Sequence, residues 1–134
     1  MRRVNVMILD DSELELGLAL DVLTHESFIG KISCFTDADE AREFFKDHRP
    51  EMILVDFNMN AQDGINFIES LGDARHETVT VILSGDKDFR KIEKARNLNV
   101  SAWIDKPIDS SRLLEVVKQV PELGWCMLKG DRVA

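Results

Sequence analysis

Five short apolar runs, each followed by a polar residue, alternate with five helix-like segments along this chain. The runs cover residues 4–9, 32–35, 52–55, 79–83 and 102–104. Short apolar runs that alternate with helical patterns are typical of parallel strands buried on both faces of a sheet. Right-handed crossovers between such strands place helices on both faces. The sequence therefore predicts an α/β fold, with a five-stranded parallel sheet covered by five helices.

The segments between the runs carry helix signals. Ser12 and Glu15 have the S-x-x-E spacing of a capping box, which predicts that a helix starts there. Asp109 or Ser110 is expected to cap the last helix. In the first helix, we expect an apolar stripe of Leu14, Leu18 and Val22, with Leu16, Leu20 and Leu23 beside it. The apolar positions expected in the later helices are Ala38, Ala41, Phe45, Ile65, Ile68, Leu71, Phe89, Ile92, Ala95, Leu98, Leu113, Leu114, Val117 and Val120. Gly64 is expected to provide a turn before the third helix.

Composition and charge narrow the class of protein. The 134 residues are 44% hydrophobic and 31% charged, as in one globular domain. A net charge of −8 argues against direct nucleic-acid binding, because phosphate contacts need lysine and arginine. No apolar stretch approaches the ~20 residues of a membrane helix, and the N-terminal run is too short for a signal peptide. The two cysteines suggest no disulfide framework. We expect a cytoplasmic protein.

Polar side chains follow four of the apolar runs. Asp10 and Asp11 follow the first, Asp56 the third and Ser84 the fourth, while Lys106 lies two residues beyond the fifth. In open α/β sheets, ligands bind outside the carboxyl ends of the strands. Clustered carboxylates repel one another unless a cation neutralises them. A hard ion such as Mg²⁺, or Mn²⁺ in its place, suits such oxygen ligands and also accepts phosphate oxygens.

The remaining groups at this edge suit phosphoryl chemistry. A backbone carbonyl near Asn58 could add a metal ligand, and Ser84 and Lys106 could donate to phosphate oxygens. Aspartate can itself attack a phosphoryl group and form an acyl phosphate. Each residue alone has a simpler interpretation, since acids favour helix N-termini and Asp56 or Asn58 could be turn residues. Their joint placement at one sheet edge favours a phosphoryl-transfer site.

The chain resembles the receiver domains of the two-component response regulators from Val4 to roughly Val120. The resemblance rests on Asp10-Asp11, residues 56–64, Ser84-Gly85 and residues 102–107. It implies a flavodoxin-like fold with strand order 2-1-3-4-5. Residues 1–121 would then form the receiver domain, and residues 122–134 a C-terminal tail or the start of a linker.

The resemblance also implies roles for individual residues. Asp56 would be the phosphoacceptor and a metal ligand, Asp11 a direct Mg²⁺ ligand, Asp10 a ligand mainly through water, and Asn58 a carbonyl ligand. The hydroxyl of Ser84 would respond to phosphorylation, and Lys106 would contact the phosphoryl group. Trp103 would be the aromatic residue that takes part in the conformational switch, and the bond before Pro107 would be cis. Asn58 and Asp86 would control the water that hydrolyses the acyl phosphate. Asn60 departs from the family pattern, which usually has proline there, and Trp103 replaces the usual tyrosine or phenylalanine.

The expected function is a phosphorylation-controlled switch that is not an enzyme acting on a separate substrate, although it promotes its own phosphorylation and dephosphorylation. A histidine kinase or a phosphotransfer protein would supply the phosphoryl group. A downstream protein would bind the face formed by the fourth helix, the fifth strand and the fifth helix. Two alternatives stay open: a degenerate receiver that only binds partners, and a haloacid-dehalogenase-type phosphohydrolase. The latter would need a D-x-D motif on its first strand and a cap insertion, whereas Asp10 and Asp11 are adjacent.

Overall fold

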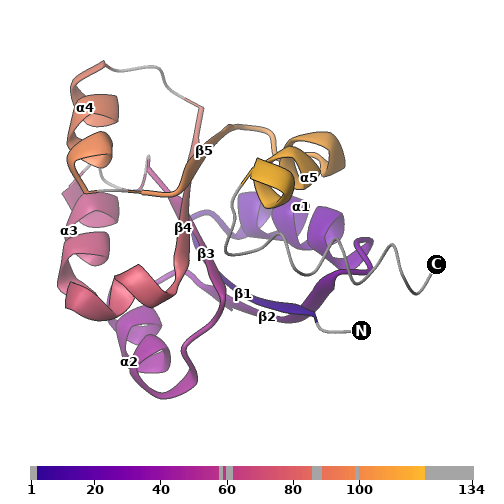
Figure 1. Ribbon diagram of the computed structural model, residues 1–134, viewed down its shortest axis with the longest axis horizontal. Coiled ribbons are helices and arrows are strands. Elements are labelled where there is room, and N and C mark those ends of the chain that lie inside the picture. The colour runs from indigo at the N-terminus through magenta and orange to yellow at the C-terminus, as the bar shows by residue number, and fades with distance from the viewer. Residues whose placement is uncertain (1–2, 58, 60–61, 86–88, 99, 120–134) are drawn as a thin grey trace.

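A computed structural model describes residues 3–57, 59, 62–85, 89–98 and 100–119 of the chain. It contains one parallel sheet in the order β2-β1-β3-β4-β5, which confirms the expected topology (Figure 1). The strands are β1 (Val4–Leu9), β2 (Ile29–Phe35), β3 (Met52–Asp56), β4 (Val79–Ser84) and β5 (Ala102–Asp105). The helices are α1 (Glu13–Thr24), α2 (Ala38–His48), α3 (Gln62–Ser70), α4 (Phe89–Asn97) and α5 (Ser110–Gln119), with a 3₁₀ helix, η1 (Gly72–Glu77), after α3.

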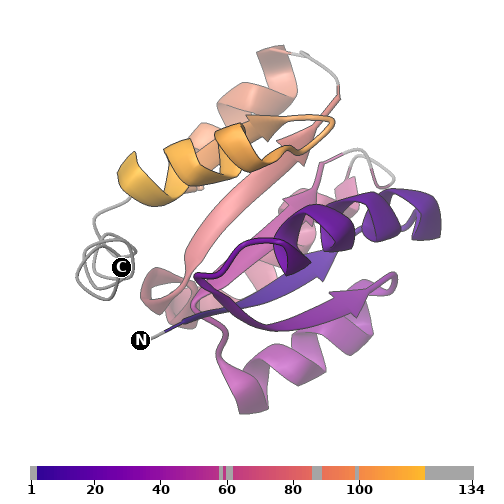
Figure 2. The same cartoon turned by 90° about the vertical axis from the view of Figure 1, so that its right-hand side faces the viewer.

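The helices cover the sheet in two layers, so the domain has two cores. Helices α1 and α5 lie on one face of the sheet, and α2, α3 and α4 lie on the other (Figures 1 and 2). Leu16 of α1 and Leu113 of α5 are buried in the first core. Phe45 of α2, Phe67 of α3 and Ala95 of α4 are buried in the second. A sheet covered on both faces explains why its central strands read as continuous apolar runs.

Side-chain alternation along the strands decides which layer the polar groups at the strand ends face. In β3, Met52 and Leu54 belong to the core under α1 and α5, whereas Ile53 and Val55 belong to the opposite core. Successive residues of a strand point to opposite faces, so Asp56 continues the first set. The same alternation in β1 places Asp10 with Val6 and Ile8. Both carboxylates therefore face the layer that contains α1 and α5.

The expected apolar stripe of α1 is partly wrong. Leu16, Ala19 and Leu23 are the buried residues of this helix, whereas Leu14 and Leu18 are 75% and 56% exposed. Leucine occupies every second position from 14 to 20, so these leucines surround the helix and do not single out its inner face. The structure thus leaves an apolar strip at the start of α1.

Three smaller expectations also need correction. Strand β2 begins at Ile29, three residues before the expected start, and η1 was not expected. Gly64 lies inside the first turn of α3, where it does not form a turn between elements. A Cβ at this position would lie 3.1 Å from the carbonyl oxygen of Asp56, so glycine permits α3 to approach the end of β3 closely.

The start of the last helix agrees with the expectation from the sequence. The Asp109 carboxylate accepts the Arg112 N–H at 2.8 Å, which identifies Asp109 as the cap of α5. Among the helices that the structure describes, none has the length and apolar character needed to cross a bilayer.

Candidate functional site

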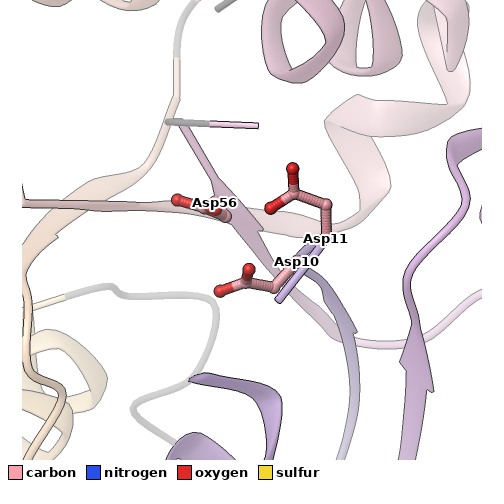
Figure 3. Close-up of side chains that lie close together, drawn as sticks. All are labelled: Asp10, Asp11 and Asp56. Atoms are coloured by element: carbon pink, nitrogen blue, oxygen red, sulfur yellow. The ribbon is translucent and has the colours of Figure 1, made fainter. Parts of the chain in front are cut away.

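Three aspartates meet at the carboxyl edge of the sheet. Leu9 pairs with Val55 in the parallel register of β1 and β3, so the residues that follow them, Asp10 and Asp56, lie side by side. Asp11 follows on the loop into α1, and one carboxylate oxygen of each aspartate lies within 4.8 Å of the others (Figure 3). Asp10 and Asp56 are buried, whereas Asp11 is exposed. The cluster is therefore open to solvent on the side of Asp11.

Lys106 brings the positive charge to this cluster. Its backbone N–H donates to the carbonyl of Ser84 at 2.8 Å, which extends the pairing of β4 and β5 by one residue. Its Nζ donates to Asp56 Oδ1 at 2.9 Å and to Asp10 Oδ2 at 3.3 Å. The bond to Pro107 is cis, as expected. The ammonium therefore holds the two buried carboxylates together.

The charged groups in this site shift one another's pKa values. Burial raises the pKa of the Asp10 carboxyl to about 6, and the neighbouring Asp56 charge acts in the same direction. The Ser12 backbone N–H, which donates to Asp10 at 2.9 Å, and the Lys106 charge oppose this shift. Burial alone lowers the pKa of the Lys106 ammonium, but its carboxylate partners outweigh burial and raise it. Lys106 is therefore fully charged at neutral pH, and Asp10 is close to its titration range.

A third acceptor on Lys106 was not anticipated from the sequence. Glu15 Oε2 lies 2.7 Å from Lys106 Nζ, closer than either aspartate. The capping-box pattern is only half realised, since Ser12 accepts from the Glu15 N–H but its own N–H donates to Asp10. The acidic residue in the first turn of α1 is the available signal, but its capping-box spacing predicts a local contact with Ser12 and not one with a distant lysine.

The remaining expected site residues are placed to different extents. Ser84 ends β4 and is buried at the same edge of the sheet. Trp103 packs against Phe57, the residue after Asp56, with ring centroids 5.4 Å apart, and belongs to the core under α2, α3 and α4. Asn58 and Asp86 lie outside the described residues, so their expected roles stay predictions.

Comparison with known proteins identifies the family. The model of the response regulator receiver domain matches residues 6–118. A protein-glutamate methylesterase/protein-glutamine glutaminase from Pseudomonas aeruginosa is 30% identical over 78% of this chain and 30% of its own length. A protein of the same description from Shewanella is 31% identical over 98% of this chain and 39% of its own length. The chain thus spans about a third of the length of these curated relatives.

Solved structures show the same fold. A receiver domain of an HD domain-containing protein from Pseudomonas fluorescens superposes with a TM-score of 0.78 at 22% identity, covering 90% of this chain and 96% of the other. A CheY-like receiver domain protein from Methanospirillum hungatei also gives 0.78, at 19% identity, with 95% and 98% covered. The family match spans nearly all of the described residues, and the strand order agrees. The chain belongs to the response regulator receiver domain family.

Proposed function

We propose that this chain is a phosphorylation-controlled switch in which Asp56 accepts a phosphoryl group from a phosphohistidine. The donor would be a histidine kinase or a phosphotransfer protein. The observation that carries the proposal is the contact of Lys106 with Asp56 at the edge where Asp10 and Asp11 converge. A buried carboxylate beside an ammonium and two further carboxylates is suited to phosphoryl transfer, which depends mainly on positioning and charge neutralisation.

The proposed transfer is a simple displacement. A carboxylate oxygen of Asp56 attacks the phosphorus atom, and the bond from phosphorus to the imidazole nitrogen breaks, with its electron pair leaving on the imidazole. Lys106 is already within hydrogen-bond distance of the acceptor carboxylate. Its ammonium can therefore donate to a phosphoryl oxygen that replaces the negative charge of that carboxylate.

The acidic cluster fits a bound Mg²⁺ or Mn²⁺. Three carboxylates with oxygens this close repel one another, and Lys106 neutralises only part of their charge. Asp10, Asp11 and Asp56 would hold the ion, together with the carbonyl of Asn58. When bound, the ion neutralises charge on the carboxylates and on the phosphoryl oxygens.

The contact between Phe57 and Trp103 supports a route from the acceptor to a partner-binding surface. Phe57 follows Asp56 directly, and Trp103 lies in β5. A movement of Phe57 would change the surroundings of the indole, and the face of α4, β5 and α5 would then bind a downstream protein. Two conformations of this face with different partner affinities are sufficient for the switch.

Metal binding should weaken in acid. The pKa of Asp10 in the folded protein, about 6, lies above its usual value of 3.8, so protons compete with the metal at this carboxylate. Mg²⁺ affinity is expected to be full above pH 7, and to fall about tenfold between pH 7 and pH 5 as Asp10 binds a proton. Calorimetric titration at several pH values measures this. Asp10→Asn should flatten the dependence, and an equally steep profile in that variant contradicts the assignment.

Asp11→Ala should abolish Mg²⁺ binding and phosphorylation while leaving the fold intact. Asp11 is exposed, so its loss is expected to change the unfolding free energy by less than about 0.5 kcal/mol. Asp47→Ala, which removes an exposed acid from α2, is the matched control and should bind Mg²⁺ normally. Labelling of Asp11→Ala at the wild-type rate would exclude a role for this carboxylate.

A further inference from the structure

The ammonium of Lys106 has three N–H donors, and in this structure it has three carboxylate acceptors. Glu15 lies at 2.7 Å, Asp56 at 2.9 Å and Asp10 at 3.3 Å. Every donor of Lys106 therefore has an acceptor before any phosphoryl group arrives. A phosphoryl oxygen can gain a hydrogen bond from Lys106 only if one carboxylate gives one up.

The three acceptors differ in how easily they can release the lysine. The side chains of Asp10 and Asp56 are 3% and 2% exposed, so loss of the ammonium before transfer would leave a buried charge without its cation. The Glu15 side chain is 44% exposed. It also lines a pocket of about 270 Å³ beside Lys106 and Pro107, where water can solvate the released carboxylate. In the unphosphorylated protein, Glu15 is thus the partner whose release costs least.

We propose that Glu15 is a positioning residue that holds Lys106 in the unphosphorylated protein and competes with the phosphoryl group for it. This inference rests on the proposed function. Glu15 opposes phosphorylation in two ways, since its charge repels an anionic donor and its hydrogen bond retains the lysine. Both effects lower the rate of phosphorylation. Removal of the Glu15 charge should therefore make the acceptor easier to phosphorylate, which is opposite to the effect of structural damage.

The test compares three variants with the wild type. Glu15→Gln removes the charge, and Glu15→Asp keeps the charge but withdraws the carboxylate by one methylene. Glu13→Gln removes an exposed charge from the same turn of α1 and is the matched control. The measurements are the rate of phosphorylation by acetyl phosphate and the affinity for beryllofluoride, a phosphoryl analogue, both with Mg²⁺ present.

Glu15→Gln is expected to raise the rate and the affinity roughly twofold to fivefold, the upper part of the range for a partly exposed ion pair. Glu15→Asp should also raise the rate and the affinity, because its carboxylate no longer reaches Lys106. The logarithm of each increase should be at least half of that for Glu15→Gln. Glu13→Gln should match the wild type. An unchanged Glu15→Gln overturns the proposal, and so does an equal gain in Glu13→Gln, which would reveal a general charge effect. Wild-type behaviour of Glu15→Asp also overturns it, since direct contact would then be irrelevant.

A readout without metal separates this proposal from the proposed function. In metal-free protein, the Lys106 ammonium should exchange its protons slowly, as observed by NMR, because three carboxylates hold it. Glu15→Gln should accelerate this exchange, whereas Glu13→Gln should not. Unchanged exchange in Glu15→Gln overturns the proposed contact. The wild type could instead show slow proton exchange at Lys106 but neither become phosphorylated nor bind beryllofluoride. This result would overturn the proposed function of Asp56 and, with it, the competition for Lys106.

Discussion

Asp56→Asn is expected to abolish phosphorylation. The wild-type chain, incubated with acetyl phosphate and Mg²⁺, should gain one phosphoryl group in its intact mass, and the variant none. Asparagine has nearly the same shape as aspartate, but its amide is a poor nucleophile for phosphorus. The neighbouring aspartates should not replace it, because Asp56 is the member of the cluster that receives Lys106 at 2.9 Å.

The control for this experiment is Asp105→Asn. Asp105 is an exposed aspartate at the end of β5, on the same edge of the sheet. This control removes one negative charge from the same edge and should be labelled like the wild type. Labelling of Asp56→Asn at the wild-type level would assign the acceptor to another carboxylate. Labelling of neither the wild type nor the control would favour a receiver that binds partners without phosphorylation.

Lys106→Met should destabilise the metal-free protein strongly. Methionine preserves much of the side-chain length but leaves Asp10 and Asp56 buried without their cation. Removal of one partner from a buried ion pair costs 3–5 kcal/mol in other proteins. Glu15 is partly exposed and can be solvated, so we expect the lower end here, a loss of about 3 kcal/mol in unfolding free energy at neutral pH. Urea denaturation measures this loss.

Two comparisons make this prediction specific. Lys94→Met removes an exposed lysine from α4 and should change the unfolding free energy by less than about 0.5 kcal/mol. Saturating Mg²⁺ should restore part of the stability of Lys106→Met, because the ion neutralises the same carboxylates. A loss no larger than that of Lys94→Met would mean that Lys106 contributes little to holding the cluster together.

Most of the fold and the centre of the site follow from the sequence because both depend on strand order and alternation. An apolar run followed by an acid specifies a strand and also the edge at which the acid lies. This was sufficient to bring Asp10, Asp11, Asp56 and Lys106 together. Local sequence also predicts a cap at Asp109 or Ser110, and the structure identifies it as Asp109.

The errors arose where distant parts of the chain decide the result. The leucines of α1 surround the helix, so only packing against the sheet could show that Leu16 is buried and Leu14 exposed. The sequence predicts a turn at Gly64, whereas this glycine permits the close approach of α3 to the Asp56 carbonyl. The bond from Glu15 to Lys106 joins residues 91 positions apart, and a long flexible side chain gives no local sign of such a partner.

The alternation of side chains in the sheet separates two tasks. Asp10, Asp56 and Lys106 face the layer of α1 and α5, whereas Trp103 and Phe57 belong to the core under α2, α3 and α4. The sheet thus separates the carboxylates and Lys106 from the aromatic pair of Phe57 and Trp103. Substitutions in the α1 layer can act on the carboxylates directly, whereas Trp103 is linked to them through the backbone from Phe57 to Asp56 and through β5 to Lys106. Under the proposed function, the rate of phosphorylation and the response to it would thus depend on side chains on opposite faces of the sheet.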